Sequence, residues 1–154
     1  MMKLCLITLF SYFLIGCSTQ NLTSANINLD DLPGTINLKI NQAHHQIPLS
    51  KYNTIKHYRD GTTSITIRDP AQKPLIEPPV LNYTGNSQVT VAFDVLKHPE
   101  LKIFFFDRKK NKEVQVKIKK NIFNLPEQVG TYDYYIQALW SNAEATYTFS
   151  VNIK

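Results

Sequence analysis

The side chains that could do catalytic chemistry in this 154-residue chain are few and scattered. Of the four histidines, His44 and His45 are adjacent, so an extended backbone points them to opposite faces. Ligands that diverge in this way do not share one metal ion, and His98 precedes a proline in an expected loop. No Gly-x-Ser-x-Gly, His-Glu-x-x-His or glycine-rich phosphate loop is present. We therefore expect no catalytic residue, no metal site and no cofactor, with solvated or turn histidines as the simpler interpretation.

The N-terminus has the pattern of an export signal. A positively charged start is followed by an apolar stretch over residues 4–15, which is too short to span a bilayer comfortably. The stretch ends in Leu14-Ile15-Gly16-Cys17, which resembles the bacterial lipobox. In that motif small residues precede the cleavage site, and the cysteine thiolate takes a diacylglycerol as a thioether. The resemblance implies a signal peptide over residues 1–16 and lipidation of Cys17. The alternative is an ordinary signal peptide with an incidental cysteine.

The two cysteines and the polar segment after them fit this interpretation. Cys5 would be removed with the signal and Cys17 would be acylated, so the mature chain would hold no disulfide. Residues 17–34 are mostly polar, so we expect a flexible tether with a reach of about 20–25 Å. An extra edge strand at residues 27–29 is the alternative. We expect the lipid to anchor the protein to the extracytoplasmic side of a bacterial membrane, with a single domain over 35–154.

Positive charge is concentrated in residues 108–120. The segment contains Glu113 as its one acidic residue, so its charge alone exceeds the formal net charge of +5 of the whole chain. Its basic residues are Arg108, Lys109, Lys110, Lys112, Lys117, Lys119 and Lys120. We expect them to lie on one hairpin and to attract anionic lipid head groups or envelope polymers. The exported location argues against a nucleic-acid partner. The plainer alternative is a solvated hairpin whose lysines discourage edge-to-edge aggregation.

The elements that must position these groups have the pattern of strands. Residues 130–140 and 145–153 alternate apolar with polar side chains and are joined by a polar linker of hairpin length. A hairpin is expected over 35–49, and residues 52–58 are ambiguous. The other expected strands are residues 62–68, 88–95, 101–107, 113–118 and 121–125. No window of helical length shows helical periodicity, so the sequence predicts an all-β chain.

Two further expectations concern the first of these strands and the segment that follows it. The strand at 62–68 is rich in β-branched residues, and we expect Ile65 and Ile67 to point inward. Four prolines lie between residues 70 and 79, and proline cannot donate to a sheet ladder. We therefore expect a loop or a sheet edge there.

The spacing of these strands resembles that of an immunoglobulin-like antiparallel β-sandwich with additional N-terminal strands. Tyr132 lies where that fold often has its corner tyrosine, and Tyr134 takes the place of the second cysteine of antibody domains. Much of the mature chain also resembles a group of small bacterial lipoproteins without an assigned function. They share a lipobox, an early hairpin, a central proline-containing stretch and an ending like GTYDYYIQALW…YTFSVNIK. This resemblance implies the sandwich fold and the membrane location only.

An apolar surface is expected on the outer face of this sandwich. In the immunoglobulin-like fold, the strands at 101–107 and 130–140 are neighbours in one sheet. With Ile103 and Phe105 pointing inward, the side chains left outside are Phe104, Phe106, Tyr135 and Leu139. An exposed apolar patch of this kind usually marks a binding surface. The alternative is that residues 35–68 fold over this face and bury it.

Together these patterns predict a membrane-anchored envelope lipoprotein. We expect it to act as a non-catalytic binding or accessory module for a protein or an anionic envelope polymer. The alternative is a small envelope enzyme or inhibitor that acts through loop residues. A concave pocket with convergent titratable groups would favour the enzyme, and a flat or ridged face would favour the module.

Overall fold

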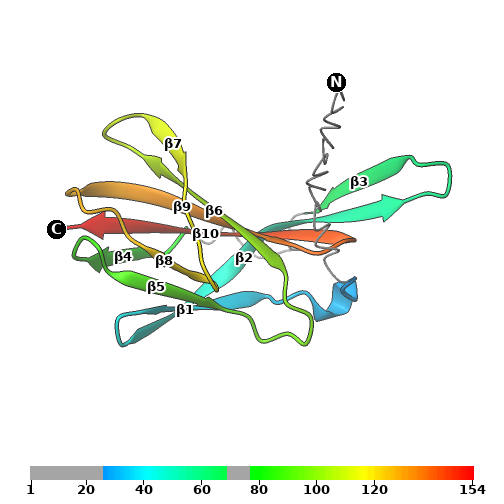
Figure 1. Cartoon of the computed structure of the whole chain (residues 1–154), viewed down its shortest axis with the longest axis horizontal. Coiled ribbons are helices and arrows are strands. Elements are labelled where there is room, and N and C mark those ends of the chain that lie inside the picture. The colour runs from blue at the N-terminus through cyan, green and yellow to red at the C-terminus, as the bar shows by residue number, and fades with distance from the viewer. Residues whose placement is uncertain (1–25, 69–76) are drawn as a thin grey trace, which may run out of the picture.

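The structure is a computed structural model that describes residues 26–68 and 77–154 (Figure 1). In this part of the chain, ten strands form one curled, largely antiparallel sheet with the shape of a half-barrel. The single helical element described there is a 3-10 turn, η1 (Leu29–Asp31). The predicted all-β class is therefore confirmed. The expected signal peptide and Cys17 lie outside the described residues. Within those residues we find no helix with the length and apolar character needed to cross a bilayer.

The strands of the sheet do not follow chain order. They are β1 (Thr35–Ile40), β2 (Ala43–His57), β3 (Thr63–Arg68), β4 (Val80–Tyr83), β5 (Gln88–Ala92), β6 (Glu100–Asp107), β7 (Lys112–Gln115), β8 (Ile122–Asn124), β9 (Gly130–Leu139) and β10 (Ala143–Ile153). Across the sheet the order is β7-β6-β9-β10-β2-β1-β5-β8, with β3 beside β2 and β4 beside β10 (Figure 1). The β4–β10 pair is parallel, whereas β9 and β10 pair antiparallel along their whole length.

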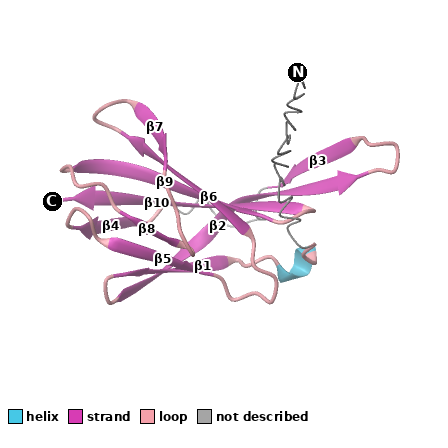
Figure 2. Cartoon of the chain, viewed as in Figure 1, coloured by secondary structure: helices cyan, strands magenta, loops and turns pink. Residues whose placement is uncertain are grey.

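The long strand β2 connects the two halves of the curled sheet. Its first half pairs with β1 up to Pro48, and its second half pairs with β10 from Leu49 to Thr54. The register shifts by one residue opposite Thr146 and Tyr147, which leaves Ser50 as the extra residue of a β-bulge. Because a bulge bends its strand and increases the local twist, β1, β5 and β8 turn back to face β9 and β10 (Figure 2). The ambiguous segment 52–58 is thus largely a continuation of β2.

The hydrophobic core fills the inside of this curl. The inward positions predicted for the C-terminal hairpin are all buried, and they are Tyr132, Tyr134, Ile136, Ala138, Trp140, Tyr147, Phe149, Val151 and Ile153. From the facing strands come Ile36, Leu38, Ile40, Val89, Val91 and Phe123. Rings meet across the core, with Phe123 5.8 Å from Tyr134 and Phe93 6.0 Å from Tyr147 between ring centroids. The predicted inward face of the C-terminal hairpin is confirmed.

The β2–β3 ribbon departs from the sequence-based expectation. Ile65 and Ile67 are 62% and 70% exposed, so the prediction that they point inward is wrong. Alternation identifies the two faces of a strand, but burial requires a layer of structure across one of them. Among the described residues β3 pairs with β2 alone, and the ribbon extends beyond the body of the sheet (Figure 1). Its isoleucines therefore remain in solvent.

The segment that precedes β1 is docked on the domain. The Asn142 side-chain amide donates to the Ile27 carbonyl at 2.7 Å, and its oxygen accepts from the Ile27 amide at 2.8 Å. Ile27 is 5% exposed, and the Tyr147 hydroxyl donates to the Pro33 carbonyl at 2.7 Å. Residues 26–34 thus differ from the flexible tether expected over 17–34. The polar composition of this segment did not indicate that Ile27 would be buried. It also did not indicate that side chains of β10 and of the turn before it would bind the main chain of the segment.

Candidate functional site

The expected apolar face is built on the predicted pair of strands, β6 and β9. Phe104 lies directly opposite Tyr135, and their rings stack with centroids 5.0 Å apart and planes 12° apart. Phe106 lies opposite Asp133, and Gln137 separates Leu139 from Tyr135 along β9. All four apolar side chains are half-buried. The structure therefore brings Phe104 and Tyr135 together, while Phe106 and Leu139 stand beside polar neighbours.

Residues 35–68 extend the sheet instead of lying over this face. β2 pairs with the edge of β10 that is opposite β9, and β1 and β3 pair with β2 in turn. On the inner side, Ile103 is fully buried and Phe105 packs against the core. The inward and outward positions of β6 are thus as the sequence predicts.

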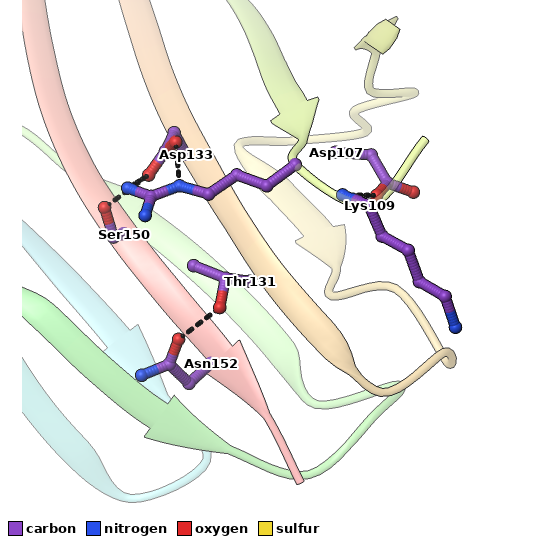
Figure 3. A network of polar contacts seen from close by, with 7 residues as sticks. Asp107, Lys109, Thr131, Asp133, Ser150 and Asn152 are labelled. Atoms are coloured by element: carbon purple, nitrogen blue, oxygen red, sulfur yellow. Dashed lines mark hydrogen bonds and ion pairs between the residues drawn. The ribbon is translucent and has the colours of Figure 1, made fainter. Parts of the chain in front are cut away.

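A polar network lies beside the aromatic pair on the outer face (Figure 3). Arg108 donates from Nε and Nη2 to the two Asp133 carboxylate oxygens at 2.6 and 2.8 Å. The Ser150 hydroxyl donates to the same carboxylate at 2.6 Å. The hydrogen bond from Arg108 lowers the pKa of Asp133 below its ordinary value, with Ser150 contributing in the same direction. Arg108 is therefore neutralised locally by a bidentate pair.

Glu113 connects the basic segment to the aromatic pair. The Tyr135 hydroxyl donates a hydrogen bond to the Glu113 carboxylate. Burial, and then the neighbouring Glu113, raise the pKa of Tyr135 to about 12. The one acidic group of the basic segment is thus engaged by Tyr135.

The basic segment begins in the β6–β7 turn. Asp107 accepts hydrogen bonds from the amides of Lys109 and Lys110, both at 3.0 Å, and Asn111 has a φ of 51°. Lys110 reaches back to Gln128 at 2.6 Å. These contacts fix the turn and leave the side chain of Lys109 exposed.

The remaining lysines lie on the connection from β7 to β8. Lys119 and Ile122 exchange two backbone hydrogen bonds at 3.0 Å, around Lys120 and Asn121 with φ of 51° and 61°. The Asn121 carbonyl accepts from the Val91 amide at 2.9 Å, so this tight turn lies against β5. The prediction that the seven basic residues share one hairpin is therefore wrong. They form two groups, one at the β6–β7 turn and one at the turn before β8.

The basic segment is largely without ionic partners. Within residues 26–68 and 77–154 the ion pairs are Arg108–Asp133 at 2.6 Å and Lys110–Asp107 at 3.6 Å. The basic residues of the segment that have no ion-pair partner there are Lys109, Lys112, Lys117, Lys119 and Lys120. Lone lysine ammonium groups at a surface keep their full positive field.

Two shallow pockets border the two basic groups, and the sequence did not reveal them. The first, of about 380 Å³, has the apolar side chains of Phe105, Val114 and Pro126 next to Lys110 and Lys112. The second, of about 410 Å³, lies beside the turn before β8 and is lined by Val116, Lys117, Ile118, Lys119, Ile122, Phe123 and Asn124. The first pocket is also lined by Asp107 and Glu127, which balance its two lysines. The second has lysines as its charged lining residues, so it suits an anionic group on a partly apolar carrier better.

Two of the four histidines, His45 and His57, make separate contacts. His45 Nε2 lies 2.5 Å from the Tyr83 hydroxyl, and His57 contacts Thr63 and the Ser141 carbonyl at 3.2 and 3.1 Å. Among the described residues no three histidine, cysteine or acidic side chains are grouped as metal ligands would be.

Comparison of this chain with protein-family models, curated proteins and solved structures found no match. The structure defines a class of domain, a curled all-β sheet whose surface carries two groups of lysines without ion-pair partners in the part of the chain that is described. Its function is inferred from those groups, from the contacts around them and from the N-terminal sequence.

Proposed function

We propose that the protein is a lipoprotein of the bacterial cell envelope, anchored through Cys17, that acts as a non-catalytic module binding an anionic envelope polymer. The observation that carries the proposal is the pair of lysine groups without ionic partners among the described residues. Each lysine near an anionic surface contributes about 1 kcal/mol of attraction. Two groups on one domain can engage successive charges of a polymer, which suits a repeating anion better than a single small one.

The position of the lysines relative to the anchor supports the same proposal. Asn26, where the described chain begins, contacts Ser141 beside the β9–β10 turn. The β6–β7 turn lies at the other end of β9, because Asp107 pairs with Tyr132 whereas Glu100 pairs with Leu139. These ends are roughly 25 Å apart along the strand. The first lysine group is thus remote from the point where the chain leaves toward Cys17.

We also infer that the domain is an elaborated immunoglobulin-like sandwich. β5 pairs with β8, and β6 with β9, which pairs with β10, as expected for strands B–E and C–F–G of that fold. The parallel pairing of β4 with β10 is compatible with a first strand beside the last. The Tyr132 hydroxyl donates to the Gln128 carbonyl at 2.8 Å, in the manner of a corner tyrosine. β1, β2 and β3 are then the additional N-terminal strands.

A protein partner on the Phe104–Tyr135 face is the competing proposal. The stacked pair lies on the outer face of the sheet, which would give a partner an apolar contact. The half-buried state of these rings and the polar residues around Phe106 and Leu139 make the contact small. We therefore favour the polymer, and one experiment distinguishes the two.

The test is co-sedimentation of the unlipidated chain from Cys17 to Lys154 with purified envelope across a salt series. We expect binding that weakens as salt rises, because screening shortens the range of the lysine field. The double variants Lys109→Gln/Lys112→Gln and Lys117→Gln/Lys119→Gln should each weaken binding roughly tenfold or more. The control Lys39→Gln/Lys51→Gln removes the same charge from exposed positions elsewhere, and should have a much smaller effect.

The other outcomes separate the competing proposals. Equal losses in the basic-segment variants and in the control would show that net charge alone drives binding. Salt-insensitive binding that is lost in Phe104→Ser would favour a protein partner. No binding at any salt concentration would favour the small enzyme or inhibitor.

A further inference from the structure

The end of the domain where the described chain begins also carries most of its exposed apolar side chains. The large hydrophobic residues that are exposed in the described chain are Tyr58, Ile65, Ile67, Val80, Leu96 and Val129. Tyr58, Ile65 and Ile67 belong to the β2–β3 ribbon, which we call the arm (residues 55–68). The arm adjoins the β9–β10 turn, since the Ile55 amide donates to Asn142 and His57 contacts Ser141.

The anchored segment meets the domain at the same turn. Asn142 holds the main chain of Ile27, and Ser141 contacts Asn26. From this turn the arm projects away from the body of the sheet (Figure 1). The point where the chain leaves toward Cys17 and the base of the arm are thus neighbours.

The arm is an amphipathic ribbon. Ile55 pairs with Ile65 and so shares a face with it, and Ile67 follows on that face two residues along β3. Lys56 falls on the opposite face of the ribbon by the same alternation. Ile65 and Ile67 are 62% and 70% exposed, so neither is covered.

The tip of the arm adds an aromatic ring and another cation in a fixed turn. Asp60 accepts hydrogen bonds from the amide and the hydroxyl of Thr62 at 2.9 and 2.7 Å. The Tyr58 amide donates to the Thr62 carbonyl at 2.9 Å, and Gly61 takes a φ of 84° that favours glycine. Tyr58 is 52% exposed, and Arg59 beside it is exposed as well. Tyrosine and arginine are residues that favour the membrane–water interface.

We propose that the arm is a second membrane contact of this protein. Ile65 and Ile67 enter the interface of a bilayer that contains anionic lipids, with Tyr58 at the tip of the arm, while Lys56 and Arg59 remain at the level of the head groups. This is the arrangement by which amphipathic elements lie in a membrane surface. The proposal rests on the proposed lipid anchor at Cys17, which keeps this end of the domain close to the bilayer. The chain from Cys17 to Asn26 can span at most about 30 Å.

Charge favours a bilayer over a second copy of the chain as the partner of the arm. The arm contains Lys56, Arg59 and Arg68 against Asp60 alone, so it is positive. Two arms paired along β3 would bring their cations together, whereas anionic head groups complement them. Leu96 is exposed at this end too, but Asp94 and Glu100 lie on either side of it in sequence. The contact is therefore assigned to the arm and not to the β5–β6 loop.

A membrane contact through the arm would also orient the domain. A tether alone lets the domain rotate, whereas tether and arm together fix two points near the surface. The β6–β7 turn, at the far end of β9, then faces away from the bilayer. Its lysines would be presented to polymers outside the membrane and not to the head groups beneath.

The test is binding of the unlipidated chain from Cys17 to Lys154 to vesicles of phosphatidylglycerol and phosphatidylcholine. Every core residue of the described chain lies between Ile27 and Ile153, so the chain from Cys17 retains all of them. We expect Ile65→Ser/Ile67→Ser to reduce partitioning roughly fivefold or more. The control Val129→Ser changes a residue that is 68% exposed at the other end of the sheet, and should leave partitioning unchanged.

A fluorescence experiment places the tip of the arm directly. In Tyr58→Trp, the new indole replaces a side chain that is 52% exposed, while the native Trp140 is 2% exposed and serves as a constant background. Vesicles should shift the emission of the new indole to the blue, and brominated lipids should quench it. Emission that does not respond to bound vesicles would overturn the proposal.

Two further outcomes would refute the arm as a membrane contact. Vesicle binding that is lost in Lys109→Gln/Lys112→Gln, and unchanged in Ile65→Ser/Ile67→Ser, would assign the contact to the β6–β7 turn. A dimer in sedimentation that Ile65→Ser/Ile67→Ser dissociates would identify a second copy as the partner. Polymer binding is measured without vesicles, so failure of the proposed function is seen separately from failure of this inference.

Discussion

Replacing Tyr134 with phenylalanine should make the protein more stable. The Tyr134 side chain is 2% exposed, and its hydroxyl has no hydrogen-bond partner among the described residues. The ring itself is well packed, stacking on Phe149 at 4.9 Å with planes 11° apart. Tyr134→Phe keeps this stacking and removes the group that loses its water on folding without replacing it.

The size of the gain follows from the two terms that the substitution changes. An unpaired buried hydroxyl costs about 1–3 kcal/mol of folding free energy. The small gap that the missing oxygen leaves offsets part of this, so we expect the free energy of unfolding to rise by about 1 kcal/mol. For a domain of this size, that corresponds to a Tm higher by about 3–5 °C.

Tyr147→Phe is the matched control. Tyr147 is also fully buried, but its hydroxyl donates to the Pro33 carbonyl at 2.7 Å. Removing that hydroxyl leaves a carbonyl without its partner, so the free energy of unfolding should fall by about 1 kcal/mol. The two substitutions remove the same atom and should have opposite signs.

The assay is urea unfolding followed by circular dichroism at pH 7 and again between pH 9 and about 11, where free tyrosine ionises. Burial raises the pKa of Tyr134 and of Tyr147 above the ordinary value, so the folded state keeps both hydroxyls protonated. This stabilisation is complete below the unfolded pKa and is lost as pH rises toward the folded pKa. The free energy of unfolding should therefore decrease less steeply at alkaline pH in Tyr134→Phe than in the unchanged protein.

A free energy of unfolding that is lower by 1 kcal/mol or more in Tyr134→Phe at pH 7 would refute the reasoning, because it would show that a buried water satisfies the hydroxyl.

Two other substitutions test single contacts. Gly85→Ala would place a Cβ 2.6 Å from the backbone oxygen of Glu127, so unfolding by urea should show a loss of about 1–3 kcal/mol; Gly34→Ala, with no atom within 4 Å of its Cβ, should change stability little. Asp133→Asn should remove a contribution to stability that is sensitive to acid. Arg108 lowers the pKa of Asp133 in the folded state. The resulting stabilisation is therefore present above the ordinary pKa of aspartate and is lost as pH falls through the folded pKa. Asp133 is about one-third exposed, so the loss in the free energy of unfolding should be about 0.5 kcal/mol. The same dependence of stability on acidic pH in Asp133→Asn and in the unchanged protein would contradict this assignment.

The sequence predicted the fold correctly where the apolar residues of an alternating strand are also the buried ones. From Tyr132 to Trp140 every second residue is buried. On β10 the apolar positions are buried in the same way, and Thr146 and Ser150 on the other face are buried too. The pairing of β6 with β9 was also predicted. This prediction came from the expected neighbouring strands of the immunoglobulin-like fold. The stacking of Phe104 on Tyr135 agrees with it.

The errors occur where burial depends on segments far away in the sequence. Ile65 and Ile67 have the residue type and spacing of core positions, yet within residues 26–68 and 77–154 β3 pairs with β2 alone and both isoleucines are exposed. β4 was missed because its four residues follow prolines and pair with β10 some 70 positions later, in parallel (Ser150 opposite Val80). Neither outcome can be derived from a window of local sequence.

The basic segment shows why a run of charge in sequence does not specify a charged surface. Between Lys112 and Lys119 the chain leaves the β6–β7 hairpin and turns beside β5, so neighbours in sequence end at two places on the domain. The positive φ of Lys120 and Asn121 makes the second turn, and asparagine adopts that conformation more readily than most residues. Asp107 and Asp133 then neutralise Lys110 and Arg108. The charge available to a ligand is thus decided by strand register and by acidic neighbours on β6 and β9, which composition alone does not contain.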